Sequence, residues 1–305
     1  MDYDLYHDES KVDGYWHGML LIPNSAKKVI FTHLQEARIR NSYMSPIHFA
    51  DVKKKDSPIG RCATDWASLC PAFLMQKFKG REPYRVLHRN KPEYSESERS
   101  AKTHYKKIFE IKSNNEIIGA KFLLFKEKDS FKKMYTSSYK KKVISTLRMG
   151  MLGGIHYLAN TENPVNIKSL HFDGWEHHGT HITMSEIKKK IDKNREYFSI
   201  DDACAIFDNS SDHTKEGSQS YVDCQFLQLC DLLVSGFRSL ISKSNSAAKQ
   251  NILNSFEEIL KKWDDRRMRN SKWNGGFWMS ECHLESGGWK FNDLRSSSHH
   301  PTLLI

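Results

Sequence analysis

The sequence lacks the features that mark membrane-spanning or secreted proteins. Its longest apolar stretches are about nine residues, whereas a transmembrane helix needs roughly 20. The first ten residues, MDYDLYHDES, are acidic, whereas a signal peptide begins basic and then turns apolar. The six cysteines form no C-x-x-C pair, so buried reduced thiols are a simpler interpretation than disulfides. We therefore expect a cytoplasmic protein that does not enter a membrane.

Several catalytic signatures are also missing. The glycines of GRCATDW and MGMLGG fit neither the phosphate-binding loop G-x-x-x-x-G-K-S/T nor the dinucleotide pattern G-x-G-x-x-G, and no serine lies in a G-x-S-x-G elbow. These absences argue against a nucleotide-cradling loop and against serine hydrolase chemistry. The chain does contain 7 Trp, 16 Phe and 12 Tyr, which is too aromatic for a disordered protein. We expect a folded chain with a substantial core.

Positive charge is abundant and gathered in runs. The net charge is +10, and basic runs occur at 53–55, 126–133, 140–142, 188–190 and 266–269. Any one run could be a solvated helix face. Together they favour a nucleic acid or another phosphate-rich partner, because clustered cations attract polyanions through counterion release.

Hydrophobic periodicity predicts a hairpin followed by strands that alternate with helices. Strands are expected at 3–10, 15–23, 45–53, 116–128, 165–176 and 203–208. Helices are expected from Asn24 or Ser25 to 41, and at 65–78, 139–160, 185–198, 221–242 and 249–269. This order predicts an α/β fold, a mixed sheet with helices on both faces. We expect one main domain, 1–245, with a C-terminal helix and an aromatic-rich tail, 246–305, packed on or beside it.

Three aspartates stand where chemistry is expected. Asp8, with Glu9 beside it, ends the first strand, Asp173 ends a later strand, and Asp231 interrupts the apolar helical run FLQLCDLLVSGF. An ionised carboxylate is costly to bury without a partner. Carboxylates that converge need a cation, and Mg²⁺ and Mn²⁺ prefer such oxygen ligands together with substrate phosphates. Two such ions can promote phosphodiester hydrolysis.

Each aspartate also has a structural explanation. Asp8 and Glu9 could belong to a strand-to-turn transition, and Asp173-Gly174 is a common turn dipeptide. Asp231 could be satisfied by buried hydrogen-bond donors. It lies on a polar helical stripe beside the apolar one, which suits a ligand aimed at a cleft. The stripe consists of Gln228, Asp231, Ser235 and Arg238.

These motifs resemble a bacterial family of RNase H-like proteins catalogued as domain of unknown function 3800. The likeness rests on Asp8–Ser10, on Asp173–Glu176, and on the closing-helix segment LQLCDLLVSG at 227–236. It spans residues 3 to about 242 and implies an RNase H-like fold, metal-dependent nuclease activity and a role in phage defence. The family tends to carry a further acidic position before its middle helix. Asp51 is the nearest match here, or His48 if the register shifts.

The segment HFDGWEHHGTH adds histidines beside Asp173. His177 and His181 have the i, i+4 spacing of a zinc-binding helix, although Gly179 lies between them and no H-E-x-x-H motif accompanies them. They could instead contact substrate or shuttle protons, or belong to an ordinary loop.

The function expected from the sequence is divalent-metal-dependent cleavage of DNA or RNA. Asp8, Asp173 and Asp231 are the expected metal ligands for Mg²⁺ or Mn²⁺, and Glu9 and Glu176 are secondary catalytic candidates. One alternative is a non-catalytic nucleic-acid-binding or assembly subunit, which would have a protein partner in a defence complex. Another is a phosphoryl-transfer enzyme acting on a small nucleotide. The sequence leaves the oligomeric state open.

Overall fold

The computed structural model describes most residues of the chain. They are 1–74, 119–127, 144–145, 147, 150–159, 164–173, 182–191, 196–209, 219–244, 246–268, 276–285, 288–292 and 294. The predictions for Glu176, His177 and His181 lie outside the described residues.

A seven-stranded mixed sheet forms the centre of the molecule, with the strand order β5-β4-β1-β2-β3-β6-β7. The strands β1 (Asp2–Ser10), β2 (Tyr15–Pro23) and β3 (Lys121–Glu127) are antiparallel neighbours. On one side, β4 (Val165–Phe172) lies parallel to β1, and β5 (Phe198–Asp208) lies parallel to β4. On the other side, β6 (Phe277–Glu285) lies parallel to β3, and β7 (Gly288–Asn292) is antiparallel to β6.

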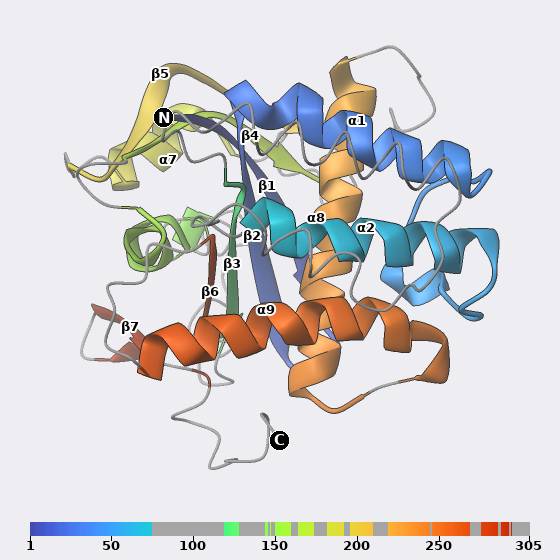
Figure 1. Ribbon diagram of the computed structural model, residues 1–305. Helices are drawn as coiled ribbons and strands as arrows, with labels where there is room; N and C mark the ends of the chain where they lie inside the picture. Colours follow the sequence, from blue (N-terminus) through green and yellow to red (C-terminus); the bar gives the residue numbers. More distant parts are fainter. Residues whose placement is uncertain are drawn as a thin grey trace.

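Helices cover both faces of this sheet, as Figure 1 shows. One face packs against α1 (Asn24–Arg40), α2 (Pro58–Leu74), α8 (Gln219–Ile241) and α9 (Gln250–Met268) around a large apolar core. The other face carries a smaller core with α7 (Met184–Ile191) and the short helical turns Gly150–Gly154 and Ile155–Tyr157. The predicted mixed α/β sheet is therefore confirmed.

Alternation along β1 decides which side chains reach α8. Tyr6 belongs to the core on the α8 side, whereas Leu5 belongs to the core on the opposite side. Because side chains of a strand alternate between faces, Asp4 and Asp8 share the face of Tyr6. Glu9 projects from the opposite face.

Helix α8 packs very closely on β1 and β2. The thiol sulfur of Cys230 lies 3.6 Å from the carbonyl oxygen of Tyr6 and 3.7 Å from that of Gly18. A Cβ atom on Gly18 would lie only 2.2 Å from a methyl carbon of Val234. A small side chain on each element therefore lets the helix approach the strands, and Asp231, the next residue after Cys230, lies beside the sheet.

Three segments before β3 differ from the sequence predictions. Helix α2 begins at Pro58 instead of 65, since the Ser57 hydroxyl accepts a hydrogen bond from Gly60 N at 3.2 Å, and proline suits a first helical position. Helix α1 has Pro23 at its N-cap and no side-chain cap. The predicted strand at 45–53 is wrong, because Phe49–Asp51 forms a 3₁₀ turn.

Two further differences concern the sheet edges. The strand expected at 203–208 is longer, Phe198–Asp208, and most of it is partly or fully exposed because β5 is an edge strand. The region after 270 was expected to be a tail, but it contributes β6 and β7. These strands extend the central sheet beyond β3, so residues from the predicted C-terminal addition belong to the same sheet as β1.

Among the described residues, no helix is both long enough and apolar enough to cross a membrane.

Candidate metal centre

Asp8 is a partly buried carboxylate on the α8 side of β1. Its pKa is raised well above its usual value, first by burial and then by the negative charges of Asp231 and Asp173. A backbone hydrogen bond from Glu9 opposes this shift. Among the described residues, no lysine or arginine pairs with Asp8. Within the described part of the chain, no lysine or arginine therefore neutralises the ionised form of Asp8.

Asp173 and Asp231 approach Asp8 from separate elements. Strands β1 and β4 run parallel with His7 opposite Phe172, so Asp8 and Asp173 come next at neighbouring positions. Asp231 comes from α8, which packs over β1. Both carboxylates raise the pKa of Asp8 electrostatically, so Asp231, from the middle of α8, lies near the C-terminal ends of β1 and β4. We call Asp8, Asp173 and Asp231 the acidic site.

Asp231 also accepts hydrogen bonds, as expected if buried donors satisfy its carboxylate. Phe49 N donates to Oδ2 at 3.0 Å, and the Ser235 hydroxyl donates to Oδ1 at 3.1 Å. His48 Nδ1 lies 3.6 Å from Oδ2. This pairing with Asp231 is the main reason why the pKa of His48 is raised, and Asp51 and Asp173 raise it further. The segment 48–51 therefore contributes an imidazole beside Asp231, and the exposed Asp51 carboxylate acts on that imidazole.

A buried arginine holds this segment against α8. Arg38, at the C-terminal part of α1, is fully buried, and its guanidinium donates to the side-chain oxygens of Gln225 and Gln228, each at 2.7 Å. The same group donates to the carbonyl oxygens of Tyr43 and Ser45. Gln228 also accepts a hydrogen bond from Ile47 N at 2.8 Å. These contacts fix the chain just before His48, and Gln228 is the predicted polar-stripe residue that makes them possible.

Glu9, a secondary catalytic candidate, lies on the other face of the sheet. Its carboxylate accepts a hydrogen bond from the Tyr15 hydroxyl and pairs with Lys11 at 2.8 Å. His17 Nδ1 lies 3.9 Å from the same carboxylate and His17 Nε2 lies 2.8 Å from Glu127 Oε1. Glu9 therefore belongs to a separate polar cluster, and its side chain does not share the face of the acidic site.

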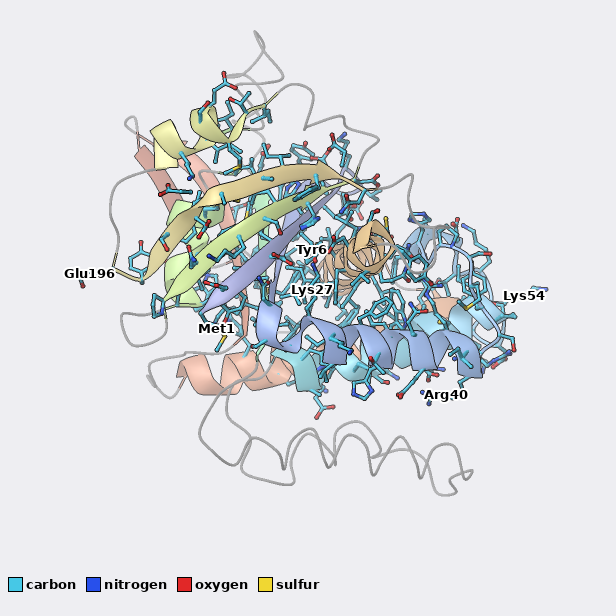
Figure 2. All side chains as sticks on the ribbon, turned by 90° about the horizontal axis from the view of Figure 1, so that it is seen from above. Met1, Tyr6, Lys27, Arg40, Lys54 and Glu196 are labelled. Atoms are coloured by element: carbon cyan, nitrogen blue, oxygen red, sulfur yellow. The ribbon has the colours of Figure 1, made fainter. Side chains whose placement is uncertain are left out.

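A second acidic group was not identified from the sequence. Asp4, His171 and Asp223 have candidate ligand atoms that all lie within 4.8 Å of one another, and they form the only such group among the described residues. Lys27 Nζ lies 2.5 Å from Asp4 Oδ2 and 2.6 Å from Asp223 Oδ1. Figure 2 shows Lys27 beside Tyr6, between the sheet and the helices. We call these residues the Lys27 cluster.

Hydrogen bonds complete the Lys27 cluster. The Tyr6 hydroxyl donates to Asp223 Oδ1 and the Ser169 hydroxyl to Asp4 Oδ1, both at 2.6 Å. Asn209 Nδ2 lies 2.7 Å from His171 Nδ1. Burial lowers the pKa of His171 to about 4, so this imidazole is neutral near pH 7. Because the Lys27 ammonium already bridges both carboxylates, these residues do not fit a metal ion, and the cluster is structural.

A sequence signal for the Lys27 cluster did exist. Asp4 and Asp8 are four residues apart and so share a face of β1, and Asp223 precedes Asp231 by about two helical turns and so lies on the same side of α8. Neither the strand period nor the helix period predicts that Lys27, on α1, reaches these two carboxylates.

Comparisons of the chain with protein-family models, with curated protein sequences and with solved structures each found no match. The family resemblance inferred from the motifs therefore stays a prediction, and the function has to be argued from the geometry of the site.

Proposed function

We propose that this protein is a divalent-metal-dependent nuclease that hydrolyses phosphodiester bonds of DNA or RNA at the acidic site. One observation carries the proposal: Asp8 lies among Asp173 and Asp231, and its pKa is raised by them and by burial, with no paired lysine or arginine among the described residues. The contrast with the Lys27 cluster is informative. There Lys27 supplies a cation, whereas no lysine or arginine among the described residues does so for Asp8, so a bound cation would stabilise its ionised form.

The donor atoms of the acidic site are of the type that Mg²⁺ or Mn²⁺ prefers, but the three carboxylates do not bring their ligand atoms within 4.8 Å of one another as those of the Lys27 cluster do, so a bound ion would have to draw them together. Asp8, Asp173 and Asp231 offer only carboxylate oxygens, which hard divalent ions prefer over nitrogen or sulfur ligands. When bound, such an ion supplies an activated water and neutralises charge on the phosphoryl group. The chain's own contribution is to hold the carboxylates. Phe49 N and Ser235 fix the orientation of Asp231, and the rigid β1–β4 pairing sets the spacing of Asp8 and Asp173.

The sheet supports the finer assignment to an RNase H-like fold. The five strands β3-β2-β1-β4-β5 consist of an antiparallel triplet followed by two strands parallel to β1. The acidic site lies where β1 and β4 end, under α8. This arrangement agrees with the motifs that suggested the family, namely an acidic first strand, an acidic strand end and a closing helix with a central aspartate.

A cleavage assay tests the proposal. Wild-type protein would be incubated with Mg²⁺ or Mn²⁺ and with single-stranded and duplex DNA and RNA, alongside Asp8→Asn, Asp231→Asn and Glu9→Gln. We expect wild type and Glu9→Gln to cleave at least one substrate, and the two aspartate variants to lose cleavage while staying folded. EDTA should abolish the activity.

The other outcomes each point elsewhere. Cleavage that survives in both aspartate variants would place the activity at another site or in a contaminant. Salt-sensitive binding without cleavage by the wild type would favour the non-catalytic subunit. Turnover of nucleotides but not of polymers would favour a small-nucleotide enzyme.

A further inference from the structure

An open hollow of about 520 Å³ lies next to the segment that carries Asp51. Both α2 and α9 begin at the same end of the molecule, on the right in Figure 1. The hollow is bordered by the loop that leads into α2 and by the turn that leads into α9. We call it the lysine hollow; its lining residues are Lys53, Lys54, Lys55, Asp56, Ser57, Ala247 and Ala248.

Backbone contacts hold the lysine loop in place. The carbonyl oxygen of Lys54 accepts a hydrogen bond from the Ser57 hydroxyl at 2.6 Å and another from Ser57 N at 3.3 Å. Gly60 packs so tightly beneath the loop that a Cβ atom there would lie 2.3 Å from the Lys54 carbonyl oxygen and 2.7 Å from that of Lys55. The Arg61 guanidinium donates to the carbonyl oxygen of Asp56. The three lysines are thus presented from a loop with a defined shape.

The ammonium groups of Lys53–Lys55 are exposed, and Figure 2 shows Lys54 at the outer end of the molecule, pointing away from the sheet. The N-terminal ends of α2 and α9 add partial positive charge, since the amides of a first helical turn lack partners within the helix. Asp56 is the one acidic residue in the lining. Positive charge therefore outweighs negative charge around the hollow.

A chain of contacts joins the lysine hollow to the acidic site. Lys249 Nζ lies 4.2 Å from the centre of the Phe49 ring, and Phe49 N donates to Asp231. The pKa of Lys249 is lowered, first by burial and then by the nearby charges of Lys53 and Arg238, while Asp231 and Asp51 oppose this shift. Cations are thus crowded between the hollow and the carboxylates, and an incoming anion would relieve their repulsion.

We propose that the lysine hollow binds the backbone phosphates of a nucleic-acid strand whose neighbouring phosphodiester lies at the acidic site. This inference rests on the proposed nuclease function and names the substrate contact. The lining contains three lysines, no aromatic ring and no side-chain amide, so it offers charge for phosphate and no ring on which a base could stack. Binding there is therefore expected to depend mainly on the phosphate backbone.

The spacing suits a polymer rather than a single nucleotide. Lys54 follows Phe49, whose backbone N donates to Asp231, by five residues, which span at most about 18 Å of extended chain. Nucleic-acid strands in a duplex advance by roughly 3.4 Å per phosphate along the helix axis. A strand held at both places would therefore contribute a few consecutive phosphates, whereas the open shape of the hollow gives a mononucleotide no enclosing wall.

Equilibrium binding tests the proposal with two variants of equal charge change. Fluorescence anisotropy with labelled single-stranded and duplex oligonucleotides would compare wild type, Lys53→Ala/Lys54→Ala/Lys55→Ala, and the control Lys188→Ala/Lys189→Ala/Lys190→Ala on α7. The control helix packs on the opposite face of the sheet. The salt slope is the slope of the logarithm of the binding constant against the logarithm of the salt concentration. For single strands, we expect this slope to be shallower by about 2 in the hollow variant, and the affinity near 0.1 M salt to be lower by roughly 100-fold. The control should keep the wild-type slope.

A second variant separates loop shape from charge. Gly60→Ala keeps every lysine but forces the Lys54 and Lys55 carbonyl groups to move, so it should weaken binding, measured at a temperature where circular dichroism shows the variant to be folded. Equal losses in the hollow and control triple variants, or an unchanged slope in the hollow variant, would overturn the proposal. So would competition by mononucleotide or inorganic phosphate that matches competition by polymer at equal phosphate concentration.

Cleavage measurements separate this inference from the proposed function. If wild type cleaves, the hollow variant should raise KM with kcat retained, whereas Asp8→Asn should abolish cleavage and keep binding. Cleavage with an unchanged KM and salt slope in the hollow variant would refute the hollow alone. Hollow-dependent binding without cleavage by the wild type would refute the nuclease and leave the hollow as a nucleic-acid site.

Discussion

The Lys27 cluster offers the sharpest energetic prediction, because one ammonium group bridges two buried carboxylates. The Lys27→Met variant removes the ammonium and keeps most of the apolar stem. Nζ lies 2.5 Å from Asp4 and 2.6 Å from Asp223, whose side chains are only 9% and 6% exposed. Breaking a buried pair by removing one partner typically costs about 3–5 kcal/mol, because the remaining charge is uncompensated. That is a large share of a total stability of about 5–15 kcal/mol.

Urea unfolding followed by far-ultraviolet circular dichroism would measure the effect at pH 7. We expect the free energy of unfolding to fall by about 3–5 kcal/mol, and the melting temperature to drop by roughly 5–15 °C. Lys188→Met is a matched control. Its partner, Asp202, is fully exposed, so this variant should unfold almost as the wild type does.

Adding Asp223→Asn to Lys27→Met should recover part of the lost stability, because the double variant no longer buries two unpaired carboxylates. A loss below about 1 kcal/mol for Lys27→Met would refute the reasoning, since the ammonium could not then be the counterion of this cluster. The cluster would in that case have to be reconsidered as a place for an external cation.

Three further predictions concern buried charges. Asp8→Asn, measured in EDTA, should raise the free energy of unfolding by about 0.5–2 kcal/mol, because it removes a buried carboxylate that is repelled by Asp231 and Asp173, and Mg²⁺ should raise the melting temperature of the wild type but not of this variant. Burial lowers the pKa of His171 to about 4, so as the pH falls the unfolded chain binds a proton at this residue before the folded chain does. The free energy of unfolding should therefore fall by about 3 kcal/mol between pH 6.5 and 4, and urea titrations of His171→Gln should lack this loss. The pKa of Lys121 is lowered to about 8, so wild-type stability should rise by about 3 kcal/mol relative to Lys121→Met between pH 8 and 10.5.

Local patterns predicted much of the fold around the site. The opening hairpin and β4 follow from short apolar runs bounded by turn residues, and the helices α8 and α9 follow from helical periodicity, because these are signals within the local chain. The interruption of an apolar helix by Asp231 correctly indicated a carboxylate on a seam beside the core. Stronger local signals were overlooked at Ser57-Pro58, where a cap and a first-turn proline start α2. The Gly- and Trp-rich region that forms β6 and β7 shows no period of its own.

The sequence by itself determined which faces the acidic side chains occupy, because the periods of a strand and a helix are properties of the local chain. Asp4 and Asp8 share a face of β1, and Glu9 lies opposite, for this reason alone. Only the tertiary structure decided which carboxylates receive a cation from the chain. Lys27 reaches Asp4 and Asp223, whereas no lysine or arginine among the described residues pairs with Asp8. That difference depends on the packing of α1 against the sheet, a long-range contact that no local period encodes.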